Sequence, residues 1–186
     1  ARLRKKWSVG TMDPPSFKWR PQGLYACFLS HYKMEAASEA RYMHDVLRKM
    51  LRCPIFLDSS TLSDLRKLVD EGVQKSDVVV LLATEDVLIR PWCLIELVEA
   101  ARARKPIVVV NVVNRGFSFH KSRQLVIELE QEMAIRNSSG LDLLRKHFGP
   151  NLDELKTTIM GVLDANESTV VHFDSHVGDN AMIGVI

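Results

Sequence analysis

A tryptophan and a glutamate four residues apart, Trp92 and Glu96, are the pair of side chains in this sequence best suited to chemistry. Residues at this spacing share one face of a helix. At about 100° per residue, Glu96 lies roughly 160° from the apolar stripe through Leu94 and Val98, so both side chains are predicted to face away from the core. An aromatic ring can stack on a nucleobase or a nicotinamide ring. A carboxylate accepts hydrogen bonds from ribose hydroxyls and stabilises the positive charge that develops when a glycosidic bond breaks.

A simpler alternative is that Trp92 packs on a loop and Glu96 is solvated, because exposed glutamates are common on helices. Which of the two holds depends on where this helix lies, and therefore on the elements around it.

Short apolar segments alternate with amphipathic ones along the chain. Strands without polar alternation, separated by helices, indicate a parallel sheet covered on both faces. Right-handed crossovers then favour an α/β, flavodoxin-like, doubly wound sheet of five parallel strands in the order 2-1-3-4-5, with helices on both faces. The apolar runs predict strands at 24–29, 55–57, 78–82, 107–112 and 169–173, and the helical stripes predict helices at 35–51, 63–73, 91–101, 121–135, 141–148 and 153–163.

In such a sheet, ligands bind beyond the carboxyl ends of the strands where the winding direction reverses, which here is between the first and third strands. Residues 84–96 form one predicted wall of this crevice, and the loop 58–62 is its neighbour. The other predicted wall consists of Ser30, His31, Tyr32 and Lys33. The imidazole of His31 could contact the substrate or make a structural hydrogen bond, and the ammonium group of Lys33 suits a phosphate. Asp58 is expected to cap its own loop through nearby backbone amides.

The same segments exclude other proteins with this fold. A phospho-receiver needs acidic residues after the first strand and an aspartate at the end of the third, where this chain has Ser30 and Thr84. No glycine- and threonine-rich loop suited to a flavin phosphate follows the first strand, and no GxGxxG motif follows any strand. His172 and His176 straddle the end of a predicted strand, so they are not expected to share a metal ion.

The overall composition fits one globular unit. The 186 residues carry a formal net charge of +2, from 25 basic and 23 acidic side chains, which is not the basic excess of a nucleic-acid binder. Three cysteines without close spacing indicate a reducing, cytoplasmic location, and no apolar run reaches membrane-spanning length. Prolines in residues 1–23 predict an extended linker, which Trp7 and Trp19 could pin onto the domain, and residues 24–186 form the domain. The uncapped apolar end, 183–186, suggests a domain cut from a longer protein.

Four ordered segments resemble the TIR (Toll/interleukin-1 receptor) family. The resemblance covers about residues 24–113, and it is most specific in a Trp-Cys-Leu-x-Glu-Leu box similar to that of plant TIR domains. After Arg115 the likeness is at the level of the fold alone. The four segments are Tyr25 to His31, the BB region from Ile55 to Leu62, Ser76 to Leu82, and Arg90 to Leu97.

This resemblance implies an activity and a set of roles. The glutamate of the box is the catalytic residue of TIR domains that cleave NAD, which here is Glu96, and the aromatic residue four positions earlier, Trp92, lies against the substrate. Ser30 to Lys33 and Cys93 are then further substrate contacts, although Cys93 could equally be a small buried apolar residue. NAD is the substrate, and neither a cofactor nor a metal is implied. Self-association with other TIR domains would use the BB loop, which consists of Asp58, Ser59, Ser60, Thr61 and Leu62.

The sequence differs from the TIR family at two places. The turn after the first strand lacks the arginine or glycine common in the family, and the BB loop lacks the Arg-Asp-x-x-Pro-Gly signature of Toll-like receptors.

Three hypotheses for the function remain. The first hypothesis is an NAD nucleosidase that releases nicotinamide and ADP-ribose or a cyclic form. The second is a non-catalytic signalling module, cytoplasmic and without a membrane span, that acts by TIR–TIR pairing in immune or cell-death pathways. The third is processing of another nucleotide or nucleic acid through Cys93, which the weak net charge does little to support.

Overall fold

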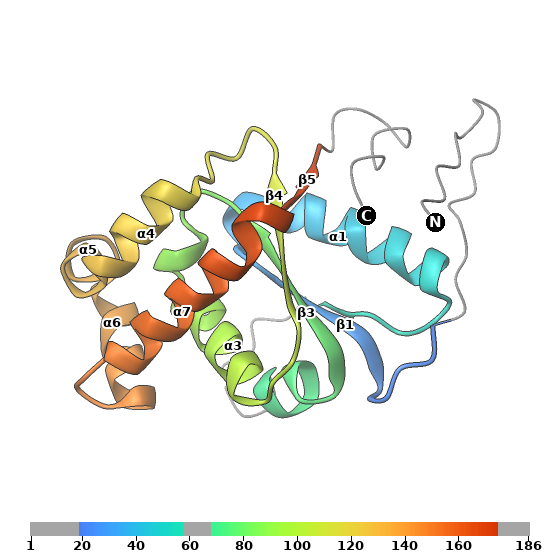
Figure 1. Cartoon of the computed structure of the whole chain (residues 1–186), viewed down its shortest axis with the longest axis horizontal. Helices are drawn as coiled ribbons and strands as arrows, with labels where there is room; N and C mark the ends of the chain where they lie inside the picture. The colour runs from blue at the N-terminus through green and yellow to red at the C-terminus, as the bar shows by residue number, and fades with distance from the viewer. Residues whose placement is uncertain (1–18, 58–67, 175–186) are drawn as a thin grey trace.

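A parallel sheet of five strands in the order β2-β1-β3-β4-β5 forms the centre of the protein (Figure 1). The computed structural model describes residues 19–57 and 68–174. Every neighbouring pair of strands is parallel, which confirms the predicted doubly wound order. The strands are β1 Tyr25–His31, β2 Phe56–Leu57, β3 Ser76–Ala83, β4 Ile107–Val112 and β5 Val171–Phe173.

Helices cover both faces of this sheet. Helix α1 (Lys33–Leu51) lies on one face, whereas α3 (Pro91–Arg102) and α7 (Asp153–Asn166) lie together on the other (Figure 1). The layer of α3 and α7 extends outward through α4 (Phe119–Ile127), α5 (Leu129–Arg136) and α6 (Ser138–Phe148). Short turns complete the chain: the π-helix η1 (Leu68–Val73) and the 3-10 turns η2 (Val87–Ile89) and η3 (Glu167–Thr169).

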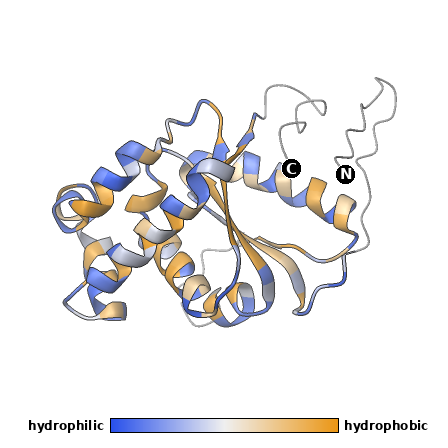
Figure 2. Cartoon of the chain, viewed as in Figure 1, coloured by the Kyte–Doolittle hydropathy of each residue, from blue (hydrophilic) through white to orange (hydrophobic). Residues whose placement is uncertain are grey.

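Side chains alternate along the central strands and divide the core in two. In β3, Leu81 packs on the side of α3, and Leu82, its neighbour, packs on the side of α1; both are fully buried. Figure 2 shows apolar residues concentrated along the strands and on the helix sides that face them. Each large apolar side chain that becomes buried contributes about 1.5–3 kcal/mol of transfer free energy. The two-sided core explains why the strands carry no polar alternation in sequence.

The structure differs from the prediction most in the region of α4, α5 and α6. The helix predicted over 121–135 is two helices, because the backbone of Glu128 leaves the helical region (φ −98°, ψ 20°) and α5 starts in a new direction. The segment Ser138–Gly140, which lies between the helices predicted at 121–135 and 141–148, instead begins α6. The side chain of Asn137 caps this helix by accepting a 3.0 Å hydrogen bond from the amide of Gly140.

The segment before β1 is fixed to the sheet by one carboxylate. Asp77 accepts a 3.0 Å hydrogen bond from the indole Nε1 of Trp19, and the amides of Gln22 and Gly23 donate to it as well. Burial alone would raise the pKa of Asp77, but these donors outweigh it and hold the pKa below its usual value. Trp19 therefore holds the segment in place, as the sequence predicted; Trp7 lies outside the described residues.

We expect Asp77→Ala to lower the free energy of unfolding by about 1–2 kcal/mol, because three donors lose a charged acceptor. Since the folded protein lowers the pKa of Asp77, its contribution is present above about pH 4 and disappears as the pH falls through the folded value. Urea unfolding at pH 7 and at pH 3 measures both effects. The loss should be smaller at pH 3, and an equal loss at the two values would contradict this role of the charge.

Candidate functional site

A buried carboxylate lies where strand β1 ends against helix α3. Glu96, in the second turn of α3, is 5% exposed, and the hydroxyl of Ser30 donates a 2.5 Å hydrogen bond to its Oε2. Ser30 precedes the last residue of β1 and is itself 1% exposed. Residues 66 positions apart in sequence thus form one polar pair at the carboxyl edge of the sheet, close to the predicted crevice between β1 and β3.

The surroundings of Glu96 differ from the open face that the helical spacing predicted. Helix α3 is buried nearly all round, because α6, α7 and η1 pack on it in addition to the sheet. Trp92 is half-buried and packs against the core on this side of the sheet. Glu96 points toward the end of β1, where it meets Ser30, and it is enclosed rather than solvated.

Cys93 also adjoins this pair. The residue is 3% exposed, and its thiol lies near both Ser30 and Glu96. Burial, followed by the charge of Glu96, raises the pKa of the Cys93 thiol above its ordinary value. A buried thiol that resists ionisation is a poor nucleophile, which argues against chemistry through Cys93.

The turn after β1 is held by contacts to the turn before α3. The guanidinium carbon of Arg90 lies 4.6 Å from the ring centroid of Tyr32. His31 is half-buried, with Nδ1 3.4 Å from the carbonyl oxygen of Leu29, and Lys33 is exposed at the start of α1. The structure therefore brings Ser30, Cys93 and Glu96 together and leaves Lys33 at the rim. Asp58, Ser59, Ser60, Thr61 and Leu62 lie outside the described residues, as does His176.

A second buried carboxylate, Glu39 of α1, escaped the sequence analysis. It is 3% exposed and accepts hydrogen bonds from Ser38 at 2.8 Å and from Nε and Nη2 of Arg115 at 3.1 and 2.5 Å. Burial alone would raise the pKa of Glu39, but these hydrogen bonds outweigh it and lower the pKa. Helical spacing could have predicted the burial of Glu39, because it is three residues after Ala36 and four before Met43, and both of these are buried.

Arg115 also ties two loops at this edge. Its carbonyl oxygen accepts a 2.8 Å hydrogen bond from the amide of Glu85, which follows β3. The neighbouring amide of Asp86 donates to Glu35 of α1 at 3.2 Å. The turns after β3 and β4 and the start of α1 are thus linked by polar contacts around the carboxyl ends of the strands.

Thr84, directly after β3, is fully buried, and its hydroxyl has no hydrogen-bond partner within the described residues. An unpaired buried hydroxyl costs free energy, so the end of β3 carries spare hydrogen-bonding capacity. Among all the described residues, no group of three or more His, Cys, Asp or Glu side chains is placed to hold a metal ion. His172 is exposed, and its Nδ1 lies 3.2 Å from the side-chain Nδ2 of Asn111.

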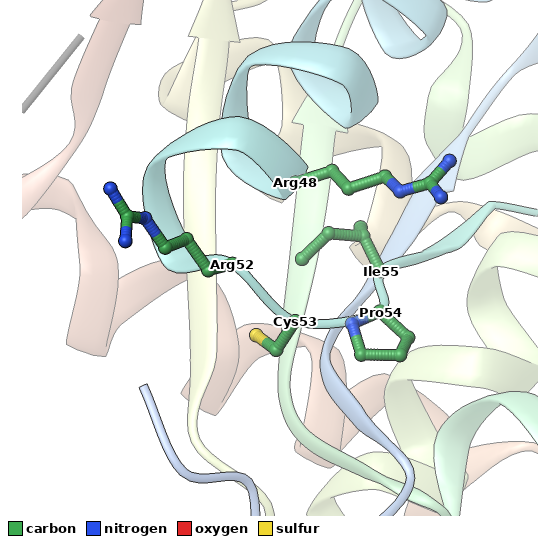
Figure 3. Close-up of a pocket in the computed structure, with 5 residues that line it drawn as sticks. All are labelled: Arg48, Arg52, Cys53, Pro54 and Ile55. Carbon is green, nitrogen blue, oxygen red and sulfur yellow. The ribbon is translucent and has the colours of Figure 1, made fainter. Parts of the chain in front are cut away.

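Two cavities lie outside the Ser30–Glu96 pair. The first, of 390 Å³, is at the amino end of β2 and is lined by Arg48, Arg52, Cys53, Pro54 and Ile55. Figure 3 shows the side chains of Arg48 and Arg52 extending in opposite directions, so they do not converge on one anion. The second, of 310 Å³, lies at the carboxyl edge, between the turns after β3 and β4 and the helices α4 and α5.

We expect the cysteines of the folded protein to resist thiol reagents. Cys27, Cys53 and Cys93 are all free and buried, and burial raises the pKa of each thiol, that of Cys27 to about 12. Titration with Ellman's reagent at pH 8 should proceed at least about tenfold more slowly in the folded protein than in urea. A fast-reacting thiol that disappears in Cys93→Ala would show that Cys93 is accessible after all.

Comparisons with known proteins bear on the fold. No protein-family model matches the sequence, and no curated protein matches it. The fold is similar to that of the TIR domains in the structure of the activated Roq1 resistosome directly recognizing the pathogen effector XopQ, with a TM-score of 0.54 and 14% sequence identity. This match covers 84% of the present chain and 92% of that chain. No helix in residues 19–57 and 68–174 is long and apolar enough to cross a membrane. At this identity the likeness concerns the fold, and the chain has the fold of a TIR domain.

Proposed function

We propose that this chain is a TIR domain that cleaves the bond between nicotinamide and ribose in NAD, with Glu96 as the catalytic residue. The observation that carries the proposal is the buried Glu96 carboxylate, oriented by the hydroxyl of Ser30 at the carboxyl edge of the sheet. A carboxylate in a site that excludes water interacts with a developing cation far more strongly than one in solution.

The chemistry needs little more from the protein. The nicotinamide of NAD is already cationic, so it leaves as a neutral ring when the bond breaks and no general acid has to protonate it. Glu96 accepts hydrogen bonds from the ribose hydroxyls and stabilises the oxocarbenium-like centre. Water then attacks the ribosyl carbon and loses a proton to solvent, which gives ADP-ribose; capture by an adenine nitrogen gives a cyclic product instead. Ser30 fixes the orientation of the carboxylate.

Burial of Glu96 also bears on activation. With the carboxylate 5% exposed, NAD reaches it only when neighbouring side chains move. Self-association through the BB loop, Asp58 to Leu62, would supply such a movement and complete the site. The Roq1 match adds support, because its TIR domains belong to a resistosome.

The direct test is chromatography of NAD after incubation with the purified protein at low and at high concentration. We expect nicotinamide release, with a rate per molecule that rises with protein concentration. If crowded, assembled protein leaves NAD intact, the nucleosidase proposal fails.

One observation favours the second candidate, a non-catalytic module that acts by pairing with other TIR domains. Trp92 packs against the core, so it is not in the open position that stacking on a substrate requires. Sedimentation of the protein with and without NAD separates the candidates: a scaffold assembles without consuming NAD, whereas the enzyme consumes it as assembly proceeds.

A further inference from the structure

The 310 Å³ cavity at the carboxyl edge combines groups of opposite character. The first turn of α4 supplies one wall, with His120, Lys121 and Ser122; the turns after β3 and β4 supply Glu85 and Gly116, and α4 and α5 close the rest with Gln124, Leu125, Glu128, Glu132 and Arg136. Leu125 is the only purely apolar side chain in this lining. The other side chains offer polar groups that a polar ligand could use.

Several charges in the lining are already balanced. Arg136 pairs with Asp86, and its Nη1 lies 3.4 Å from a carboxylate oxygen of Glu132. Among the described residues, the carboxylates of Glu85 and Glu128 and the ammonium group of Lys121 have no such partner. The cavity thus offers two unpaired acceptor groups and one unpaired cation.

Ser122 provides an independent indication of a ligand. The residue is 7% exposed and lines the cavity, and its hydroxyl has no hydrogen-bond partner within the described residues. Thr84 is the only fully enclosed unpaired side-chain group there, so the Ser122 hydroxyl retains access to the open space. An unpaired, nearly buried hydroxyl costs free energy until a ligand or water satisfies it.

The start of α4 adds donors beside this hydroxyl. The first amides of a helix have no acceptor within the helix, and they attract negative charge. Ser118 caps the nine-residue helix only weakly, since its hydroxyl accepts from the amide of Lys121 at 3.5 Å. These amides, Lys121 and Ser122 together suit a phosphate group.

Gly116 leaves room for the side chain of Glu85 at the turn after β4. A Cβ at this position would lie 2.9 Å from Oε2 of Glu85, and the backbone φ of +75° favours glycine. Glu85 can therefore lie against the turn, and with Glu128 it suits the hydroxyl groups of a sugar, which donate to carboxylates.

From this arrangement we propose that the cavity binds a small sugar phosphate, with the phosphate at the start of α4 and the sugar hydroxyls at Glu85 and Glu128. The volume is at the lower end of the usual range for ligand pockets, roughly 300–1,000 Å³, so it suits a monosaccharide phosphate rather than a dinucleotide. The site is distinct from the Ser30–Glu96 pair and does not depend on cleavage of NAD.

Isothermal titration with ribose 5-phosphate tests this proposal, with ribose alone and inorganic phosphate alone as separate arms. We expect saturable binding of ribose 5-phosphate, and binding at least about tenfold weaker in each arm that lacks one half. Lys121→Ala and Glu128→Gln should each weaken binding about tenfold, and Ser122→Ala about threefold. Lys146→Ala, an exposed lysine of α6 outside the cavity, is the matched control and should bind like the wild type.

No binding of ribose 5-phosphate, or equal binding in Lys121→Ala, would overturn the site. Inorganic phosphate that binds as tightly as the sugar phosphate would overturn recognition of the sugar. Glu96→Gln should leave the affinity for ribose 5-phosphate unchanged. The sugar-phosphate site and the proposed nucleosidase are therefore tested independently. Changes in the amide resonances of Gly116 and Ser122 on titration would locate the ligand.

Discussion

Glu96→Gln is expected to lower the rate of nicotinamide release about 100-fold or more. The substitution keeps the size and shape of the side chain, and the hydroxyl of Ser30 can still donate to its amide oxygen, but the negative charge is lost. Groups that stabilise transition-state charge in enclosed sites typically account for about 10²–10³ in rate. The measurement is chromatography of nicotinamide at a fixed, high protein concentration, with NAD in excess.

Glu99→Gln is the matched control. Glu99 is on the same helix, three residues further on, and pairs with Arg102 on the outer side. We expect this variant to retain the wild-type rate, and thermal unfolding should show that both variants fold. Nicotinamide release that persists in Glu96→Gln would remove Glu96 from its assigned role, whatever the source of the activity.

Arg115→Met is expected to lower the free energy of unfolding by about 3 kcal/mol. It removes the cation from Glu39 and leaves a carboxylate that is 3% exposed with only the Ser38 hydroxyl as a side-chain donor. Breaking a buried ion pair typically costs about 3–5 kcal/mol, and the lower end applies because the side chain of Arg115 is 42% exposed. Urea unfolding at pH 7 gives the value.

The pH dependence separates this effect from a loss of packing. In the wild type the pKa of Glu39 is lowered, so its contribution is present above about pH 4.3 and is lost as the pH falls through the folded value. In Arg115→Met, burial without the cation should raise that pKa, so the variant should gain stability between pH 7 and pH 5. Arg123→Met, which breaks an exposed pair with Asp164 and Glu167, should cost less than about 1 kcal/mol. If the two variants are equally stable at pH 7, Glu39 does not need its partner.

The architecture could be predicted because its strands are short, wholly apolar and separated by helices, and few topologies satisfy that pattern. The split between α4 and α5 could not, because it turns on the backbone of Glu128, whose side chain is as compatible with a helix as its neighbours. The start of α6 was missed for a similar reason. Serines and a glycine read as a break, whereas Asn137 makes them the first turn of a helix.

For the candidate site, helical spacing located Glu96 and Trp92 but not what covers them. Spacing describes one helix, while the burial of Glu96 comes from elements far away in sequence that pack on α3. For Glu39, helical spacing was enough to predict a place on the buried face of α1. It could not predict the partner Arg115, which is 76 positions away. The cavity lined by Ser122 and Lys121 draws on two separate turns and two helices, and no local pattern marks it.

The two outer strands are very short: β2 has two residues and β5 has three, against eight in β3. Within the part of the chain that the structure describes, each border of the sheet therefore exposes few free backbone amides and carbonyls. Such borders are poor templates for another strand, which protects against amyloid-like stacking. Filaments or rings built from this protein would then have to grow through helices and loops, and their stability should respond to side-chain charge and salt rather than to backbone hydrogen bonding.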